Sequence, residues 1–284
     1  MIGPTLETLR LSDGYAAAAR WWLPARPRGA VLYFHGIQSH GGWYEGSGQA
    51  LADAGLAVLM PDRRGSGRNT HQRGHSESVD QCVDDAVCAL DALAQRTGFN
   101  PIHVVGVSWG GKLSVALATR ALERVASVSL VAPGFFSRLD LSRGEKFRVA
   151  LSLIHERERL YDIPLNLPVL FTRTPERIDF VQRDDLRLMQ VSASFLLATR
   201  RLDKTVRGFT HSGWRGGVHL FVAGRDQIID NERCRAWLRG LPVSDRQITE
   251  YPEAEHTIEF EADPQPFYRD LTDWIVARCP PVGD

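Results

Sequence analysis

The sequence predicts an α/β fold in which a mostly parallel sheet is flanked by helices. Continuous apolar runs suit strands that are buried on both faces, and the segments between them repeat apolar residues every three to four positions, as helices do. Alternation of strand and helix implies right-handed crossovers and parallel strands. The alternation stops at residues 134–216, which predicts an insertion into this fold.

The elements follow in chain order. Two alternating stretches around Ser12-Asp13-Gly14 predict an antiparallel hairpin with strands at 5–11 and 15–23. Buried strands are expected at 30–34, 56–60, 102–107, 127–132 and 218–223, with a last strand shortly before residue 256. Helices are expected near 47–54, 79–94, 112–122 and 231–238.

The insertion predicts a second unit. Residues 134–216 have the pattern of several helices without a strand, so we expect a helical cap there and a core domain made of residues 1–133 and 217–284. Lys and Arg outnumber Asp and Glu in the insertion. It is either a solvated helical surface or a mildly cationic cap over an active site.

Composition narrows the class of protein. Lys plus Arg and Asp plus Glu both total 34, so net charge does not indicate a nucleic-acid partner. No run approaches the roughly 18 apolar residues of a membrane span, and the start of the chain lacks a signal-peptide pattern. We expect a cytoplasmic monomer or homodimer without an integral membrane span. The scattered Cys82, Cys88, Cys234 and Cys279 are expected to be reduced thiols.

The stretch Gly106-Val107-Ser108-Trp109-Gly110 follows an apolar strand and leads directly into a helix. Strand, GxSxG and helix together predict a nucleophile elbow, in which outer glycines let the central residue take strained backbone angles. The Ser108 hydroxyl is then expected at the carboxyl edge of the sheet, beside a helix N-terminus that attracts negative charge.

A serine nucleophile needs a base and a carboxylate that orients the base. Asp226 lies in the turn that follows the apolar strand "VHLFVA", and His256 lies in the loop after the last expected strand. The three residues therefore occur in the chain order Ser, Asp, His. Asp230 is the alternative acid, although we expect it to cap the next helix. His35 is an alternative base, and Glu255 stands where it could influence His256.

The oxyanion of a tetrahedral intermediate also needs two N–H donors. We expect them from the backbone of Trp109, which follows the nucleophile, and of Ile37, in the glycine-rich loop after strand 30–34. His35 would brace this loop. Candidate substrate contacts are His35, Gly36, Phe135 and Phe136.

Other features have simpler explanations. Gly65-Ser66-Gly67 begins like a dinucleotide fingerprint but lacks its final glycine, and His71 with His75 has no further metal-ligand pattern. No cofactor and no metal are therefore expected. Five aromatic residues of the insertion suit a helix core better than an acyl pocket: Phe135, Phe136, Phe171, Phe180 and Phe195. Three of its arginines could recognise an anion: Arg138, Arg173 and Arg177.

Five pieces of the chain resemble the α/β-hydrolase family: "FHGIQSHGGWY", "MPDRRGSGRN", "GVSWGGKLS", "GRDQIID" and "EAEHTIEF". They are most similar to its monoacylglycerol lipase and lysophospholipase-like branch, also described as serine aminopeptidase-like. The resemblance implies an α/β-hydrolase fold of about eight strands with an inserted cap, and the roles given above for Ser108, Asp226, His256, Ile37 and Trp109. It also implies that Asp62 is a structural acid.

These motifs predict a serine hydrolase that cleaves carboxylic esters through an acyl-enzyme, with a small acyl ester such as a monoacylglycerol or lysophospholipid as substrate. The same three residues could act on an amide, a thioester or a carbon–carbon bond beside a carbonyl, because one oxyanion site serves all of them. A protein of another class, which keeps the fold and binds a small ligand without catalysis, is the remaining alternative. Dehalogenases and epoxide hydrolases of this fold carry aspartate as the nucleophile, so a serine at that position argues against these two activities.

Overall fold

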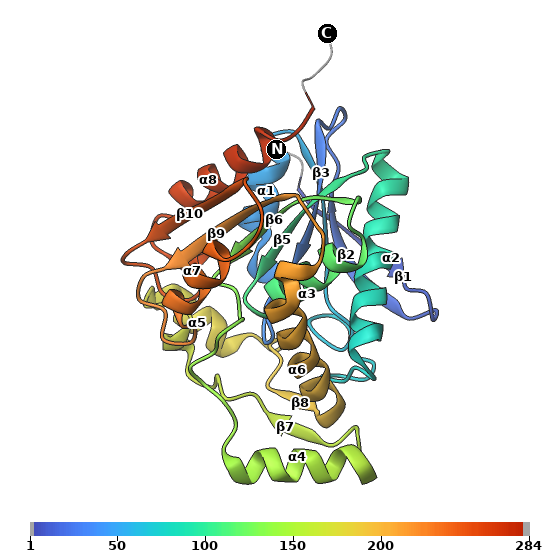
Figure 1. The fold of residues 1–284 in the computed structure, drawn as a ribbon, viewed down its shortest axis with the longest axis vertical. Coiled ribbons are helices and arrows are strands. Elements are labelled where there is room, and N and C mark those ends of the chain that lie inside the picture. Colours follow the sequence, from blue (N-terminus) through green and yellow to red (C-terminus); the bar gives the residue numbers. More distant parts are fainter. Residues whose placement is uncertain (1–2, 281–284) are drawn as a thin grey trace.

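The structure is a computed structural model that describes residues 3–280. Its central sheet has eight strands (Figure 1), in the spatial order β1 (Thr5–Arg10), β2 (Ala16–Trp22), β4 (Leu56–Pro61), β3 (Gly29–Phe34), β5 (Ile102–Val107), β6 (Val125–Val131), β9 (Gly217–Ala223) and β10 (Arg246–Tyr251). β1 and β2 form an antiparallel hairpin, and β2 is antiparallel to β4. The remaining pairs are parallel, so the predicted fold class is confirmed.

Helices pack against this sheet. α1 (Glu45–Asp53) contacts α8 (Gln265–Val276), α2 (Val79–Thr97) contacts α3 (Trp109–Arg120), and α7 (Asn231–Arg239) packs on β9. Every residue of β3, β4, β5 and β9 is buried, which explains their continuous apolar sequences. α3 begins at Trp109, three residues earlier than predicted, so no loop separates it from Ser108.

The insertion lies between β6 and β9. It contains α4 (Arg143–His155), α5 (Pro175–Arg183) and α6 (Ala193–Gly208). The expectation that it has no strand is wrong, because β7 (Leu160–Asp162) and β8 (Gln190–Ser192) pair antiparallel. Three residues are too few to show the alternation by which a strand is recognised.

The insertion covers one end of the molecule. α6 packs against α3 and α2 of the sheet domain, while α4, β7 and β8 lie together beyond α6 at the lower end of the view (Figure 1). We refer to residues 134–216 as the cap segment. The division into this cap and a core of 1–133 and 217–284 stays a prediction.

The four cysteines carry free thiols, of which Cys82 and Cys234 are buried and Cys88 and Cys279 half-buried.

The 19-residue α2 carries charges along its length. Within residues 3–280, none of the helices combines the length and the apolar composition that a bilayer crossing requires.

Candidate active site

Ser108 stands at a sharp turn between β5 and α3. Its φ of +50° lies in the left-handed region, which is strained for a residue with a side chain. Glycine is needed on both sides of it: a Cβ on Gly106 would lie 2.6 Å from the Gly110 carbonyl oxygen, and one on Gly110 would lie 2.7 Å from the His35 carbonyl oxygen. The close approach of α3 to the strands therefore presents the Ser108 hydroxyl, which is half-buried, at the carboxyl end of β5.

The structure brings Ser108, His256 and Asp226 together. His256 Nε2 lies 3.0 Å from Ser108 Oγ, and His256 Nδ1 lies 2.7 Å from Asp226 Oδ2. The other carboxylate oxygen of Asp226 accepts the backbone N–H groups of Ile228 at 2.8 Å and Ile229 at 3.0 Å. Because the carboxylate is fixed in this way, it favours the proton on Nδ1 and leaves Nε2 free to accept the serine proton.

The alternative acid, Asp230, and the glutamate beside His256 make other contacts. Asp230 caps α7 by accepting the Arg233 backbone N–H at 3.1 Å, as predicted. Glu255 is buried and forms an ion pair with Arg173, with 2.7 Å between Oε1 and Nε. Asp226 and His256 are therefore the acid and base that the geometry favours.

His35 braces the loop that follows β3. Its Nε2 accepts the Arg63 backbone N–H at 2.8 Å, so the proton is on Nδ1, which donates to the Gly36 carbonyl at 2.8 Å. Burial, with the nearby Arg63 guanidinium, lowers the pKa of His35 to about 3, so the ring is neutral at physiological pH. The Gly36 carbonyl belongs to the same peptide group as the Ile37 N–H, and this bond therefore fixes the orientation of that N–H.

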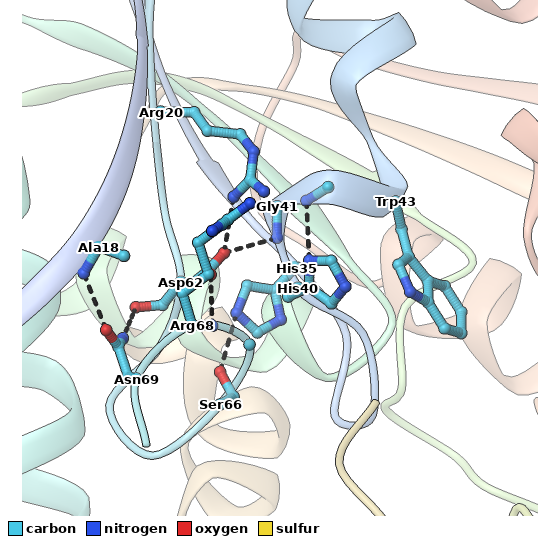
Figure 2. Close-up of polar contacts among 12 residues, drawn as sticks. Ala18, Arg20, His35, His40, Gly41, Trp43, Asp62, Ser66, Arg68 and Asn69 are labelled. Atoms are coloured by element: carbon cyan, nitrogen blue, oxygen red, sulfur yellow. Dashed lines mark hydrogen bonds and ion pairs between the residues drawn. The ribbon is translucent and has the colours of Figure 1, made fainter. Parts of the chain in front are cut away.

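Asp62 holds the other end of this loop (Figure 2). One of its carboxylate oxygens accepts the Gly41 backbone N–H at 2.8 Å and lies 3.1 Å from Arg20 Nη1, while the second oxygen accepts the Arg68 backbone N–H at 2.9 Å. Asn69 ties the same region to β2 by donating to the Asp62 carbonyl and accepting the Ala18 N–H. Asp62 therefore anchors the arginine-rich loop 63–69, which agrees with the structural role that the resemblance implies for it.

Trp109 is held from the cap segment. Its ring stacks on Phe195 with 5.2 Å between centroids, and its Nε1 donates to Thr199 Oγ1 at 3.0 Å. As the first residue of α3, it has a backbone N–H without an acceptor inside the helix. That Ile37 and Trp109 donate to an oxyanion stays a prediction.

A cavity of about 530 Å³ opens beside Ser108. Its wall includes Ile37, Trp109 and, from the cap segment, Phe135 and Phe136. The apolar part of the wall also includes Leu139, Leu141, Val149, Ala150, Leu153, Ile163, Pro164, Leu165, Leu196, Leu197, Ile228 and Ile229. The charged part is made of Lys112, Asp140, Lys146, Arg200, Asp203, Arg207 and Arg233, and Gly134, Ser137 and Thr199 line the cavity as well.

The structure separates the predicted substrate contacts. Phe135 and Phe136 line the cavity, whereas His35 and Gly36 are not part of its wall, because the ring of His35 is directed into the protein to hold the loop. The other three aromatics singled out in the insertion do not line the cavity: Phe171 and Phe195 are buried and Phe180 is exposed.

The charged residues of the cavity are ones that the sequence did not single out. Arg138, Arg173 and Arg177, the predicted anion-binding candidates, do not line it. A usable signal exists for Lys112, a charge inside the apolar helix that starts after Ser108, and for Arg200, Asp203 and Arg207, which repeat every three to four residues. That these groups face Ser108 depends on how the cap folds over the core, which the pattern does not contain.

The chain is similar to known hydrolases over most of its length. A model of the family described as serine aminopeptidase, S33, matches residues 25–263. Monoglyceride lipase from Homo sapiens is 25% identical over 280 residues, covering 96% of this chain and 90% of that protein. Phospholipase YtpA from Bacillus subtilis is 22% identical over 253 residues, covering 87% of this chain and 95% of that protein.

Solved structures agree. A soluble variant of monoglyceride lipase from Saccharomyces cerevisiae, in complex with a substrate analogue, has a TM-score of 0.85 at 17% identity, covering 99% of this chain and 97% of that one. A monoacylglycerol lipase from Paleococcus ferrophilus has a TM-score of 0.76 at 24% identity, covering 92% and 99%. At these identities the likeness shows the fold.

Proposed function

The chain belongs to the family described as serine aminopeptidase, S33, and on this premise we propose that it is a carboxylic ester hydrolase that works through an acyl-enzyme on Ser108. Its relatives include proteins named monoglyceride lipase and phospholipase, both of which are named for ester substrates. The apolar wall of the cavity beside Ser108 suits the acyl chain of such an ester.

The proposed reaction has two halves. In the first, Ser108 Oγ attacks the ester carbonyl, His256 Nε2 takes its proton, and Asp226 stabilises the imidazolium that forms. The N–H groups of Ile37 and Trp109 stabilise the oxyanion, which collapses as His256 gives the proton to the leaving alcohol. In the second, His256 takes a proton from water, the hydroxide attacks the acyl group, and the acid leaves as Ser108 regains its proton.

The observation that carries the proposal is the pair of contacts from one imidazole, 3.0 Å to Ser108 Oγ and 2.7 Å to Asp226 Oδ2. A hydroxyl with a base in reach, whose base is oriented by a carboxylate, is the arrangement that activates a serine. A non-catalytic ligand-binding protein has no need of this alignment at the wall of its cavity.

A fluorophosphonate probe tests the nucleophile. We expect the purified protein to be labelled, Ser108→Ala to lose labelling and ester hydrolysis, and the exposed Ser244→Ala to retain both. A folded wild-type protein that never reacts would favour the ligand-binding alternative. Labelling that survives in Ser108→Ala would mean that another residue is the nucleophile.

The bond that is cleaved is tested separately. p-Nitrophenyl esters of increasing chain length are compared with aminoacyl amides and acyl thioesters, with Ser108→Ala as the blank. We expect kcat/KM to be largest for an ester. A larger value for an amide or a thioester would retain the acyl-enzyme and change the substrate class.

A further inference from the structure

We propose that the substrate carries an anionic group, a phosphate or a carboxylate, which binds at a cationic rim formed by Arg200, Arg207 and Arg233 beside the Ser108 cavity. The inference deepens the proposed function and rests on it. It assigns the acyl chain to the apolar part of the cavity and the anionic group to the charged part.

α6 gives the cavity these two parts. Leu196, Arg200, Asp203 and Arg207 follow one another at spacings of three or four residues, so they lie along one face of the helix. All four line the cavity. The wall therefore changes from apolar to charged along a single helix. Arg233, in the first turn of α7, adds to the charged part.

Both lysines in the wall already pair with a carboxylate. Lys112 is buried and its Nζ lies 2.6 Å from Asp203 Oδ1, and Lys146 Nζ lies 2.5 Å from Asp140 Oδ2. Arg200 shares Asp140 at a longer distance of 3.6 Å. Asp140 and Asp203, the two acidic residues of the cavity wall, are therefore already paired with cationic side chains.

Arg207 and Arg233 keep an uncompensated charge. Both are exposed, and within residues 3–280 the structure records no hydrogen bond or ion pair made by either guanidinium group. Arg233 lies over the ring of Phe136, 4.4 Å from its centroid, which holds the guanidinium against the cavity wall. Both guanidinium groups can therefore bind an anion without breaking an existing ion pair.

The charge of the rim reaches into the cavity. Burial lowers the pKa of Lys112, and Arg200 and Arg207 lower it further, against the opposite effect of Asp203. Cations gathered beside a concave, low-dielectric wall attract anions, and a guanidinium group binds phosphate or carboxylate oxygens through two parallel hydrogen bonds. An ester with an acyl chain at one end and an anion at the other matches both parts of this cavity.

Three esters of one acyl chain test the inference: monolauroylglycerol, which is neutral, lauroylglycerol 3-phosphate and lauroyl lactate. We expect the wild-type kcat/KM to be at least about tenfold higher for one of the anionic esters, because charge-assisted hydrogen bonds contribute more than neutral ones. The phosphate and the lactate arms show which anion the rim prefers. The advantage is expected to shrink as the salt concentration rises.

The double variant Arg207→Gln/Arg233→Gln is compared with Arg201→Gln, an exposed arginine of α6 that does not line the cavity. The double variant is expected to lose about tenfold in kcat/KM on the preferred anionic ester, mainly through KM, and to keep the neutral ester within about twofold. Arg201→Gln is expected to match the wild type on both.

Equal wild-type rates on the neutral and anionic esters, or equal losses on both in the double variant, would overturn the rim and leave the ester hydrolase intact. If the wild type hydrolyses neither these three esters nor the p-nitrophenyl esters, the proposed function fails, and the rim is then judged by calorimetric titration with dodecyl phosphate and dodecanoate. Weaker binding of either anion by the double variant alone supports the rim, and equal binding by all three proteins overturns it.

Discussion

Glu259 is a buried carboxyl group three residues after His256. It accepts the Ser47 backbone N–H at 2.8 Å, the Ser47 hydroxyl at 2.5 Å and the Tyr268 hydroxyl at 3.0 Å. Burial nevertheless raises its pKa to about 7, because these donors do not replace the hydration of a carboxylate. The loop that carries His256 is therefore fixed to α1 and α8 through an acid that titrates near neutrality.

This pKa predicts the pH dependence of stability. The folded protein holds the Glu259 proton up to about pH 7, whereas the unfolded chain releases it near pH 4.5, so the free energy of unfolding falls as pH rises through this window. Glu259→Gln resembles the protonated form at every pH. It is expected to match the wild type near pH 4.5 and to be more stable by about 1–3 kcal/mol at about pH 8.

Urea unfolding at several pH values measures this difference. Glu123→Gln, at an exposed glutamate, is the matched control and is expected to follow the wild type throughout. A stability difference between Glu259→Gln and the wild type that does not change with pH would contradict a raised pKa.

The sequence predicts Ser108, Asp226 and His256 and not Glu259, for a physical reason. The first three follow strands, and the carboxyl ends of parallel strands meet at one edge of a sheet, so strand order is enough to bring them together. Glu259 acquires its role from Ser47 and Tyr268, on helices that pack together only in the folded protein. Its neighbours along the chain give no indication of its burial.

At the scale of elements, the β5–α3 turn depends on the absence of side chains at Gly106 and Gly110. Gly110→Ala would place a Cβ against the carbonyl oxygens of Phe34 and His35 in β3 and its following loop. We expect it to destabilise the protein by about 2–4 kcal/mol, because neither backbone group can move without distorting the sheet.

Thermal unfolding compares this variant with Gly144→Ala in α4. A Cβ on Gly144 meets no atom within 4 Å, so this change is expected to be neutral or to stabilise by about 0.5–1 kcal/mol through helix propensity. Similar melting temperatures for the two variants would show that the turn tolerates the added carbon.

Among the elements, the strands that are buried on both faces were predictable and the small ones were not. β3, β5 and β9 appear as apolar runs because helices cover them on both sides. β7 and β8 have three residues each, which is too short to show a periodic pattern. α8 carries a helical pattern in Phe267, Leu271, Trp274 and Ile275, although the helices expected from the sequence do not include it.

At the scale of the whole molecule, burial is uneven. α4 buries only Val149 and Ser152 of its own residues, and Val149 belongs to a small apolar cluster with Tyr161 and Ala193, separate from the main core. Its outer face exposes Phe147, Leu151 and Ile154. Little apolar area therefore holds α4 in place.

Local stability should follow this distribution. In hydrogen exchange monitored by mass spectrometry, peptides from α4 are expected to exchange at least about tenfold faster than those from α6, and β5 is expected to be the slowest of the three. α6, which packs on α2 and α3, is the internal control. Equal protection of α4, α6 and β5 would contradict this and would mean that the cap segment opens only when the whole protein unfolds.

The single carboxylate of Asp62 has a consequence for how substitutions combine. Three segments converge on its two oxygens. They are β2, which contributes Arg20, the loop that carries Ile37, which contributes Gly41, and the loop after β4, which contributes Arg68. A change that withdraws one donor leaves the same buried anion to the other two, so the energetic effects of changes in these three segments are not additive. Variation in any of them is therefore constrained by the other two, although they stand far apart along the chain.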